Sequence, residues 1–314
     1  MTQRNSGIDW FLFVLLGFLW GSSYLFIKIG VDAGLTPFTL VAVRLFFGFL
    51  LLAGVVLVAR EALPRRLTMY GHLFVMAILS VALPFSLITW AEQSVDSTLA
   101  ATLNASVPLF VIPIAAIALI DEKITTNKVI GVMVGFIGVA ILVGFDPGVL
   151  AGTDVTAALA LIGSSISYAA GGVYARRYVS GLRPMIPAMV QVGFALLITT
   201  VLALVFESPL AFPWRFDAML AVVWLGLLGS GAAYLVFFRL LGHWGATRTS
   251  LVAYLLPVYG IALGAMVLGE TIDTRLVLGT LLVIAGIALV NLRGRWVPAL
   301  GRGTTASHAE SPRS

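Results

Sequence analysis

Apolar runs long enough to cross a membrane recur along this whole sequence, and they constrain its fold more than any other feature. The hydrocarbon core of a bilayer is about 30 Å thick, so a helix needs about 20 residues to cross it. Short connections, many with Pro or Gly, separate ten such runs, at residues 8–29, 36–59, 68–90, 97–119, 127–145, 155–176, 184–206, 216–238, 246–268 and 273–292. Barrel strands would instead alternate apolar and polar residues over about ten positions. The sequence therefore predicts an all-α integral membrane protein of ten transmembrane helices.

Composition agrees with this class and excludes several others. Of 314 residues, 60% are hydrophobic and only 11% are charged, roughly half the charged fraction of a soluble domain. The absence of Cys excludes disulfides and thiolate chemistry. The three His residues lie far apart in the sequence, so we expect neither a metal site nor a cofactor. Lys and Arg are spread between the apolar runs, so we expect the lipid bilayer and a small-molecule substrate as partners, and no nucleic acid.

Basic residues near the helix ends predict the orientation, because Lys and Arg favour the cytoplasmic side of a membrane. The run 8–29 is too long for a signal peptide and lacks a cleavage site, so we expect a retained first helix. With a cytoplasmic N-terminus, 15 of the 19 basic residues fall in cytoplasmic segments, and only Lys28, Arg215 and Arg275 fall in outer connections. This split predicts that both termini are cytoplasmic.

An internal repeat predicts how the helices are organised. Two stretches share one order of Pro, Glu, Gly and Gly, namely Pro108, Glu122, Gly131 and Gly138, then Pro257, Glu270, Gly279 and Gly286. In both, the glycines follow the Glu by nine and sixteen residues. Earlier in each half, Arg44 follows Pro37 as Gln191 follows Pro184, by seven residues, and Trp20 matches Tyr168.

The repeat places five helices in each half, at residues 8–145 and 155–292. An odd number means that the second half enters the membrane from the opposite side, as in secondary transporters whose site lies between two inverted halves around a central cavity. The remaining residues, 293–314, are rich in Ser, Thr and Gly without an apolar pattern, so we expect a disordered cytoplasmic tail.

These motifs resemble a known family. The motifs are Trp20-Gly21-Ser22-Ser23, Pro37 with Arg44, the stretch from Asn104 to Pro108, and the two Glu-centred signatures. Together they are similar to the EamA family of the drug/metabolite transporter (DMT) superfamily, over roughly residues 8–292. The resemblance implies ten helices in two inverted five-helix repeats and, by its nearest subgroup, a YddG-like amino-acid exporter. One departure is Asp121 before Glu122, where the family pattern usually has Gly, as at Gly269.

Polar and aromatic residues within the spans are candidates for the substrate cavity, because polar groups in lipid are costly and usually face the bundle interior. Arg44 could contact a substrate carboxylate. The alternative that we favour on sequence alone is a structural role, in which a carboxylate or the carbonyl groups at a helix end cap Arg44. Glu92 and Asp96 are the plausible carboxylate partners, since intramembrane charges tend to pair.

Aromatic faces with hydrogen-bonding tips suit an amphiphilic ligand. The full set of candidates for the cavity is Trp20, Tyr24, Arg44, Ser86, Trp90, Asn104, Tyr168, Gln191, Tyr234 and Tyr254. For each aromatic residue, packing within the bundle is the competing interpretation, and for Trp90 a place in the interfacial belt.

Pro108 and Pro257 fall in mid-span, where each could kink its helix and act as a gating hinge, or form a static kink. The glycines of the repeat, such as Gly131, Gly138, Gly279 and Gly286, would let the fifth and tenth helices pack closely.

We therefore predict a multi-pass transporter of the bacterial inner membrane that exports small metabolites, foremost aromatic or hydrophobic amino acids, by alternating access. We expect a monomer to function alone, and we expect no catalytic residues. No ATP-binding loop is present and no Asp or Glu falls at mid-span, so we expect the substrate's own gradient to drive transport. A lipid or lipid-linked sugar flippase, and a carrier for another class of substrate, are the alternatives; a channel fits two inverted halves less well.

Overall fold

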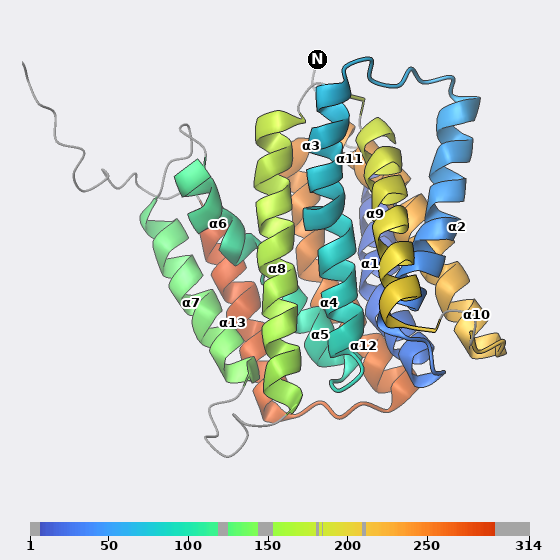
Figure 1. Ribbon diagram of the computed structural model, residues 1–314. Coiled ribbons are helices and arrows are strands. Elements are labelled where there is room, and N and C mark those ends of the chain that lie inside the picture. The colour runs from blue at the N-terminus through green and yellow to red at the C-terminus, as the bar shows by residue number, and fades with distance from the viewer. Residues whose placement is uncertain are drawn as a thin grey trace, which may run out of the picture.

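The computed structural model describes residues 7–118, 125–143, 153–179, 182–183, 185–208 and 212–292, and these form a bundle of upright helices (Figure 1). Glu122 and the tail 293–314 lie outside the described residues. Nine helices of the described part are long and apolar enough to cross a membrane, and Thr274–Val290 forms a shorter apolar helix. The chain is therefore a multi-pass membrane protein.

The first five apolar runs form α1 to α7, because two of the runs are divided. The elements are α1 (Gly7–Asp32), α2 (Pro37–Val58), α3 (Leu67–Ala77), the π-helical η1 (Ile78–Ala82), α4 (Leu83–Ala91), α5 (Ser97–Asn104), α6 (Val107–Ala118) and α7 (Thr126–Val143). Helices α3 and α4 continue one another through η1, whereas α5 and α6 are separated by a turn at residues 105–106.

The second five runs show similar divisions. The elements are α8 (Thr153–Tyr178), α9 (Met185–Phe206), α10 (Phe216–Val223), the π-helical η3 (Trp224–Ala232), α11 (Ala233–Thr249), the 3₁₀-helical η4 (Ser250–Tyr254), α12 (Leu255–Leu263), the π-helical η5 (Gly264–Leu268) and α13 (Thr274–Asn291). The predicted spans 216–238 and 246–268 correspond to Phe216–Phe237 and Leu251–Leu268, and the segment between them is helical because α11 continues up to Thr249.

Helices distant in the sequence pack together in the bundle. Helix α7 lies along α13, α2 along α9 and η3, α4 along α8, and α1 along α12. The contact between α7 and α13, seen at one side of Figure 1, is especially close. A Cβ atom on Gly286 would lie 2.6 Å from the carbonyl oxygen of Gly131, and one on Gly138 would lie 2.8 Å from that of Gly279. The expected close packing of these helices is thus present, and it depends on the missing side chains.

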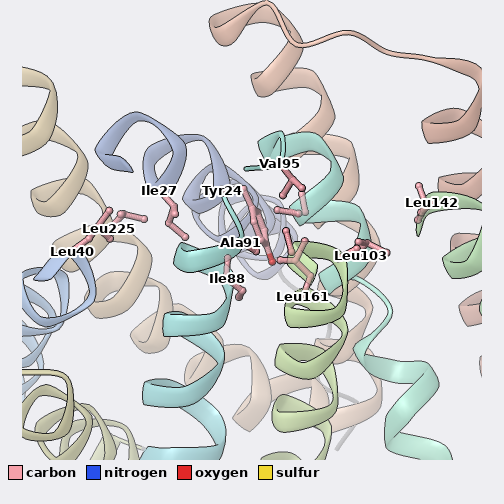
Figure 2. Close-up of a cluster of buried hydrophobic side chains, with 14 of the residues drawn as sticks. Tyr24, Ile27, Leu40, Ile88, Ala91, Val95, Leu103, Leu142, Leu161 and Leu225 are labelled. Atoms are coloured by element: carbon pink, nitrogen blue, oxygen red, sulfur yellow. The ribbon is translucent and has the colours of Figure 1, made fainter. Parts of the chain in front are cut away.

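The largest apolar core joins α1, α4, α5 and α8. Figure 2 shows Tyr24 of α1 beside Ile88 and Ala91 of α4, with Leu103 and Leu161 nearby. All five side chains are almost fully buried. This core holds the polar groups of the candidate site in fixed positions.

Two glutamates cap helices that lie far away in the chain. Glu207, directly after α9, accepts hydrogen bonds from the backbone N–H groups of Phe38 and Thr39 at 2.8 Å and from both nearby threonine hydroxyls. It therefore caps the N-terminus of α2. Acceptors at this position satisfy N–H groups that have no partner within the helix.

Glu270 has the same role at α5. Its carboxylate accepts hydrogen bonds from the N–H groups of Ser97 and Thr98 at 2.8 and 2.9 Å. Gly269, which precedes it, has a left-handed backbone with φ of 69° and ends the helical stretch there. The Glu of the second signature is therefore a helix cap.

Candidate functional site

Asn104, the last residue of α5, is the centre of a buried polar network. Its Nδ2 donates to the Tyr24 hydroxyl of α1 at 2.6 Å, and its Oδ1 accepts from the hydroxyls of Ser164 and Ser165 of α8 at 3.1 and 3.3 Å. The turn at residues 105–106 directly follows this side chain. The network therefore joins three helices where one of them is interrupted, which is where transporter sites often lie.

Arg44 of α2 carries a buried charge. Its side chain is 3% exposed, its Nη2 donates to the Ser230 hydroxyl at 3.2 Å, and its guanidinium lies 4.2 Å above the ring of Phe85. Its Nε atom has no hydrogen-bond partner among the residues described. The expectation that Glu92 or Asp96 neutralises Arg44 is not met in this structure, where a neutral hydroxyl and an aromatic face are its contacts.

Aromatic rings line the surroundings of Arg44. The Phe85 ring packs edge-to-face on Tyr168 of α8, with centroids 6.4 Å apart. Trp20 of α1 packs in the same way on Tyr234 of α11, also at 6.4 Å. Both tyrosines lie in the neighbourhood of the Arg44 charge. The structure thus gathers Trp20, Tyr24, Arg44, Tyr168 and Tyr234 in one region of the bundle.

Further polar atoms in the interior have no hydrogen-bond partner among the described residues. The Ser86 hydroxyl, the Thr89 hydroxyl and the Gln191 Oε1 atom are buried without a hydrogen bond in the described part of the chain. In the sequence of α9, Gln191 lies between Ala188 and Val192. These two residues pack in one apolar cluster with Val41 and Leu45 of α2, which lie before and after Arg44 in the sequence. Buried polar groups are nearly always satisfied by protein, water or a ligand, so this region is suited to hold a polar guest.

Two of the ten candidates, Trp90 and Tyr254, differ from the others in their surroundings. Trp90 is 45% exposed near the end of α4, the position that an interfacial Trp would occupy. Tyr254 ends η4 and packs at the margin of the large apolar core.

The two prolines lie where their spans depart from regular α-helix. Pro108 is the second residue of α6, after the turn at residues 105–106, and Pro257 is the third residue of α12, after the 3₁₀ turn η4. Each proline thus lies beside an interruption of regular α-helix within its span, and a role for either as a gating hinge stays a prediction. At Pro108 the missing N–H group costs little, because it falls in the first turn of α6, where an N–H group has no partner within the helix.

Sequence reasoning missed several contributors to the site. Phe85 under Arg44, Ser230 in η3, and the pair Ser164 and Ser165 were not singled out. The adjacent serines inside an apolar helix are the one signal that could have indicated a polar contact. Phe85 and Ser230 carry no such signal.

Two hollows open on the sides of α2. One of about 340 Å³ lies between α2, α9 and Phe212, and one of about 510 Å³ follows α2 from Leu50 to Ala59. Both are almost wholly apolar, and none of the ten candidate residues lines either of them. These surfaces fit acyl chains better than a polar solute.

Comparison with known proteins gives a consistent result. The profile of the EamA-like transporter family matches residues 8–144 and again residues 155–292. The uncharacterised inner membrane transporter YedA of Escherichia coli is 33% identical over 285 residues, which cover 90% of each chain. The uncharacterised transporter YoaV of Bacillus subtilis is 23% identical over 269 residues, 86% of this chain and 91% of its own. A solved crystal structure, 21% identical, superposes with a TM-score of 0.62 over 91% of this chain and 96% of its own, which shows a shared fold.

Proposed function

The chain belongs to the EamA-like transporter family, and from this premise we propose that it exports small carboxylate-bearing metabolites, foremost aromatic and other hydrophobic amino acids. Membrane transport is the activity that the family and its uncharacterised relatives indicate. The substrate class, the direction and the location in a bacterial inner membrane are parts of the proposal.

The architecture that we propose is ten spans in two inverted five-helix repeats, residues 8–145 and 155–292, with both termini in the cytoplasm. The double family match and the packing of α7 on α13 and of α2 on α9 support it. One such molecule contains both halves of the site, so a monomer would suffice.

The observation that carries the proposed substrate class is the buried guanidinium of Arg44, which pairs with no carboxylate among the described residues. An ion removed from water costs several kcal/mol unless it is paired. Arginine presents a planar fork that matches a carboxylate. The unpartnered Nε atom and the bond to Ser230 leave part of this fork for a ligand.

The aromatic surroundings favour an apolar side chain on the same ligand. Phe85, Tyr168, Trp20 and Tyr234 offer ring faces close to the Arg44 charge. A binding site with mainly aromatic walls and a few polar groups is typical for small ligands. An aromatic amino acid would satisfy both parts of this site.

Alternating access would use the divisions within the spans. The break before Pro108 and the 3₁₀ turn before Pro257 interrupt related spans of the two halves. The π segments η1 and η3 begin 146 residues apart, at Ile78 and Trp224. Because such segments leave the regular helical hydrogen-bond pattern, they are suited to absorb a change in helix direction.

Counterflow into liposomes tests the proposal. Vesicles with purified protein, loaded with unlabelled L-tryptophan, should accumulate labelled L-tryptophan, whereas tryptamine, which lacks the carboxylate, should not exchange. Nucleosides, sugars and a fluorescent phospholipid serve as competing classes. Exchange of tryptamine at the rate of tryptophan would contradict the role given to Arg44, and lipid scrambling without solute exchange would favour a flippase.

A further inference from the structure

The carboxylate of Glu92 is a buried acid that the proposed substrate site does not use. Glu92 follows the last residue of α4, and its side chain is 0% exposed. Neither Oε1 nor Oε2 has a hydrogen-bond partner among the residues that the structure describes. An ionised carboxylate in such a place costs several kcal/mol, whereas the neutral acid costs far less.

The charges around Glu92 do not form a direct pair with it. Lys28 of α1 is the principal cation, yet its Nζ donates to the backbone oxygen of Glu92 at 3.0 Å and pairs with Asp32 at 3.4 Å. Glu270 and Asp32 repel the carboxylate, and Arg44 attracts it from a distance. The carboxylate therefore lies in a mixed field, in which a proton can be gained or lost without breaking an ion pair.

Glu92 is also connected with the substrate site. Figure 2 shows the ring of Tyr24 beside Ala91, the residue that precedes Glu92. The Tyr24 hydroxyl accepts the hydrogen bond from Asn104, and Tyr24 interacts electrostatically with Glu92. A change of charge at Glu92 would therefore act on the network that joins α1, α5 and α8.

We propose that Glu92 is a proton-binding site that couples substrate export to proton entry, an inference that rests on the proposed transport function. In the outward-facing state, one proton binds a carboxylate oxygen of Glu92 and gives the neutral acid. In the inward-facing state, that proton leaves to the cytoplasm and restores the carboxylate before the next substrate is exported. This proposal replaces the expectation that the substrate's gradient alone drives transport.

A metal cation is a weaker occupant for this position. Hard cations take six or more oxygen ligands. The described part of the chain holds no group of three or more His, Asp or Glu residues that could ligate a metal. A proton needs one oxygen atom, which Glu92 supplies.

Proton-driven uptake and counterflow separate coupling from transport. In liposomes, an imposed pH gradient should drive accumulation of L-tryptophan by the wild type, and a trapped pH dye should report the opposite proton flux. Glu92→Gln, which cannot ionise, should lose both responses and keep tryptophan counterflow. Asp217→Asn, at an exposed carboxylate paired with Arg215, is the matched control and should retain both responses. A wild type that exchanges tryptophan but ignores the pH gradient, or that follows a Na⁺ gradient instead, overturns proton coupling and leaves the transport proposal standing.

An infrared measurement on the purified protein in lipid is independent of substrate. The wild type should show the C=O stretch of a protonated carboxylic acid that disappears as pH rises, and the Glu92→Gln variant should lack that band. If the wild type shows no such band, the proton site is refuted. If the band is present while no tested solute exchanges, the proton site stands and the proposed function fails.

Discussion

Among single side chains, substitution of Arg44 distinguishes a structural role from a substrate contact most clearly. Because no carboxylate in the described part of the chain pairs with it, we expect Arg44→Met to leave no opposite charge unpaired. Exchanging a buried charge for an apolar side chain is often neutral or stabilising. We expect an unfolding temperature equal to or above that of the wild type. Tryptophan counterflow should fall about 10- to 100-fold, because a hydrogen bond to a charged group contributes about 1.5–3 kcal/mol to binding. Thermal unfolding in detergent and counterflow at subsaturating tryptophan measure the two effects.

The conservative variant Arg44→Lys is the control for charge. It keeps a cation but loses the planar fork, so its counterflow should lie between the wild type and Arg44→Met. An Arg44→Met protein that transports normally would remove Arg44 from the site, and one that unfolds would restore its structural role.

Among helices, the contact of α7 with α13 gives the sharpest prediction. A methyl group at Gly286 would lie 2.6 Å from backbone atoms of Gly131 and Gly135, which cannot rotate away as a side chain could. Gly286→Ala should therefore force the helices apart and cost about 1–3 kcal/mol. The readout is the unfolding temperature, which should fall by several degrees.

Gly172 of α8 is the matched control, because a methyl group there meets nothing within 4 Å. Gly172→Ala should stabilise the protein by about 0.5–1 kcal/mol through helix propensity. Equal effects of the two substitutions would show that propensity, and not the close approach of α7 and α13, decides the result.

For the molecule as a unit, the orientation in the membrane is directly measurable, because the chain contains no Cys. Single cysteines at Asn5 and Ser307 should stay unlabelled by an impermeant maleimide in intact spheroplasts, since both termini are expected in the cytoplasm. Trp214→Cys, at a position 81% exposed in an expected outer connection, should be labelled. Labelling of either terminal cysteine from outside would contradict the proposed topology.

The positions of the membrane-spanning helices were predictable from the sequence, because the length of each apolar run determines where a span begins and ends. Runs such as 36–59 and 97–119 correspond to Pro37–Val58 and Ser97–Ala118, because a bilayer imposes one length on every span. The interruption after Asn104 and the π segments were not predictable, since they depend on how neighbouring helices satisfy the backbone.

The site shows the same division. Arg44, Tyr168 and Asn104 could be selected because polar groups are rare within apolar runs. Their partners could not, since Phe85 and Ser230 come from other helices and look unremarkable in sequence. The favoured carboxylate partner of Arg44 was wrong. Two residues at the same depth in the membrane can point to different sides of their helices, and the sequence does not show to which side each one points.

The glutamate caps have a consequence for how the protein is made. Helices α2 and α5 leave the ribosome early, whereas Glu207 and Glu270, which cap them, are synthesised more than 150 residues later. We therefore expect the N–H groups at the start of α2 and α5 to lack these acceptors until the second half of the chain has been made. A truncated message would therefore yield an inserted but incomplete product, a natural substrate for membrane quality-control proteases.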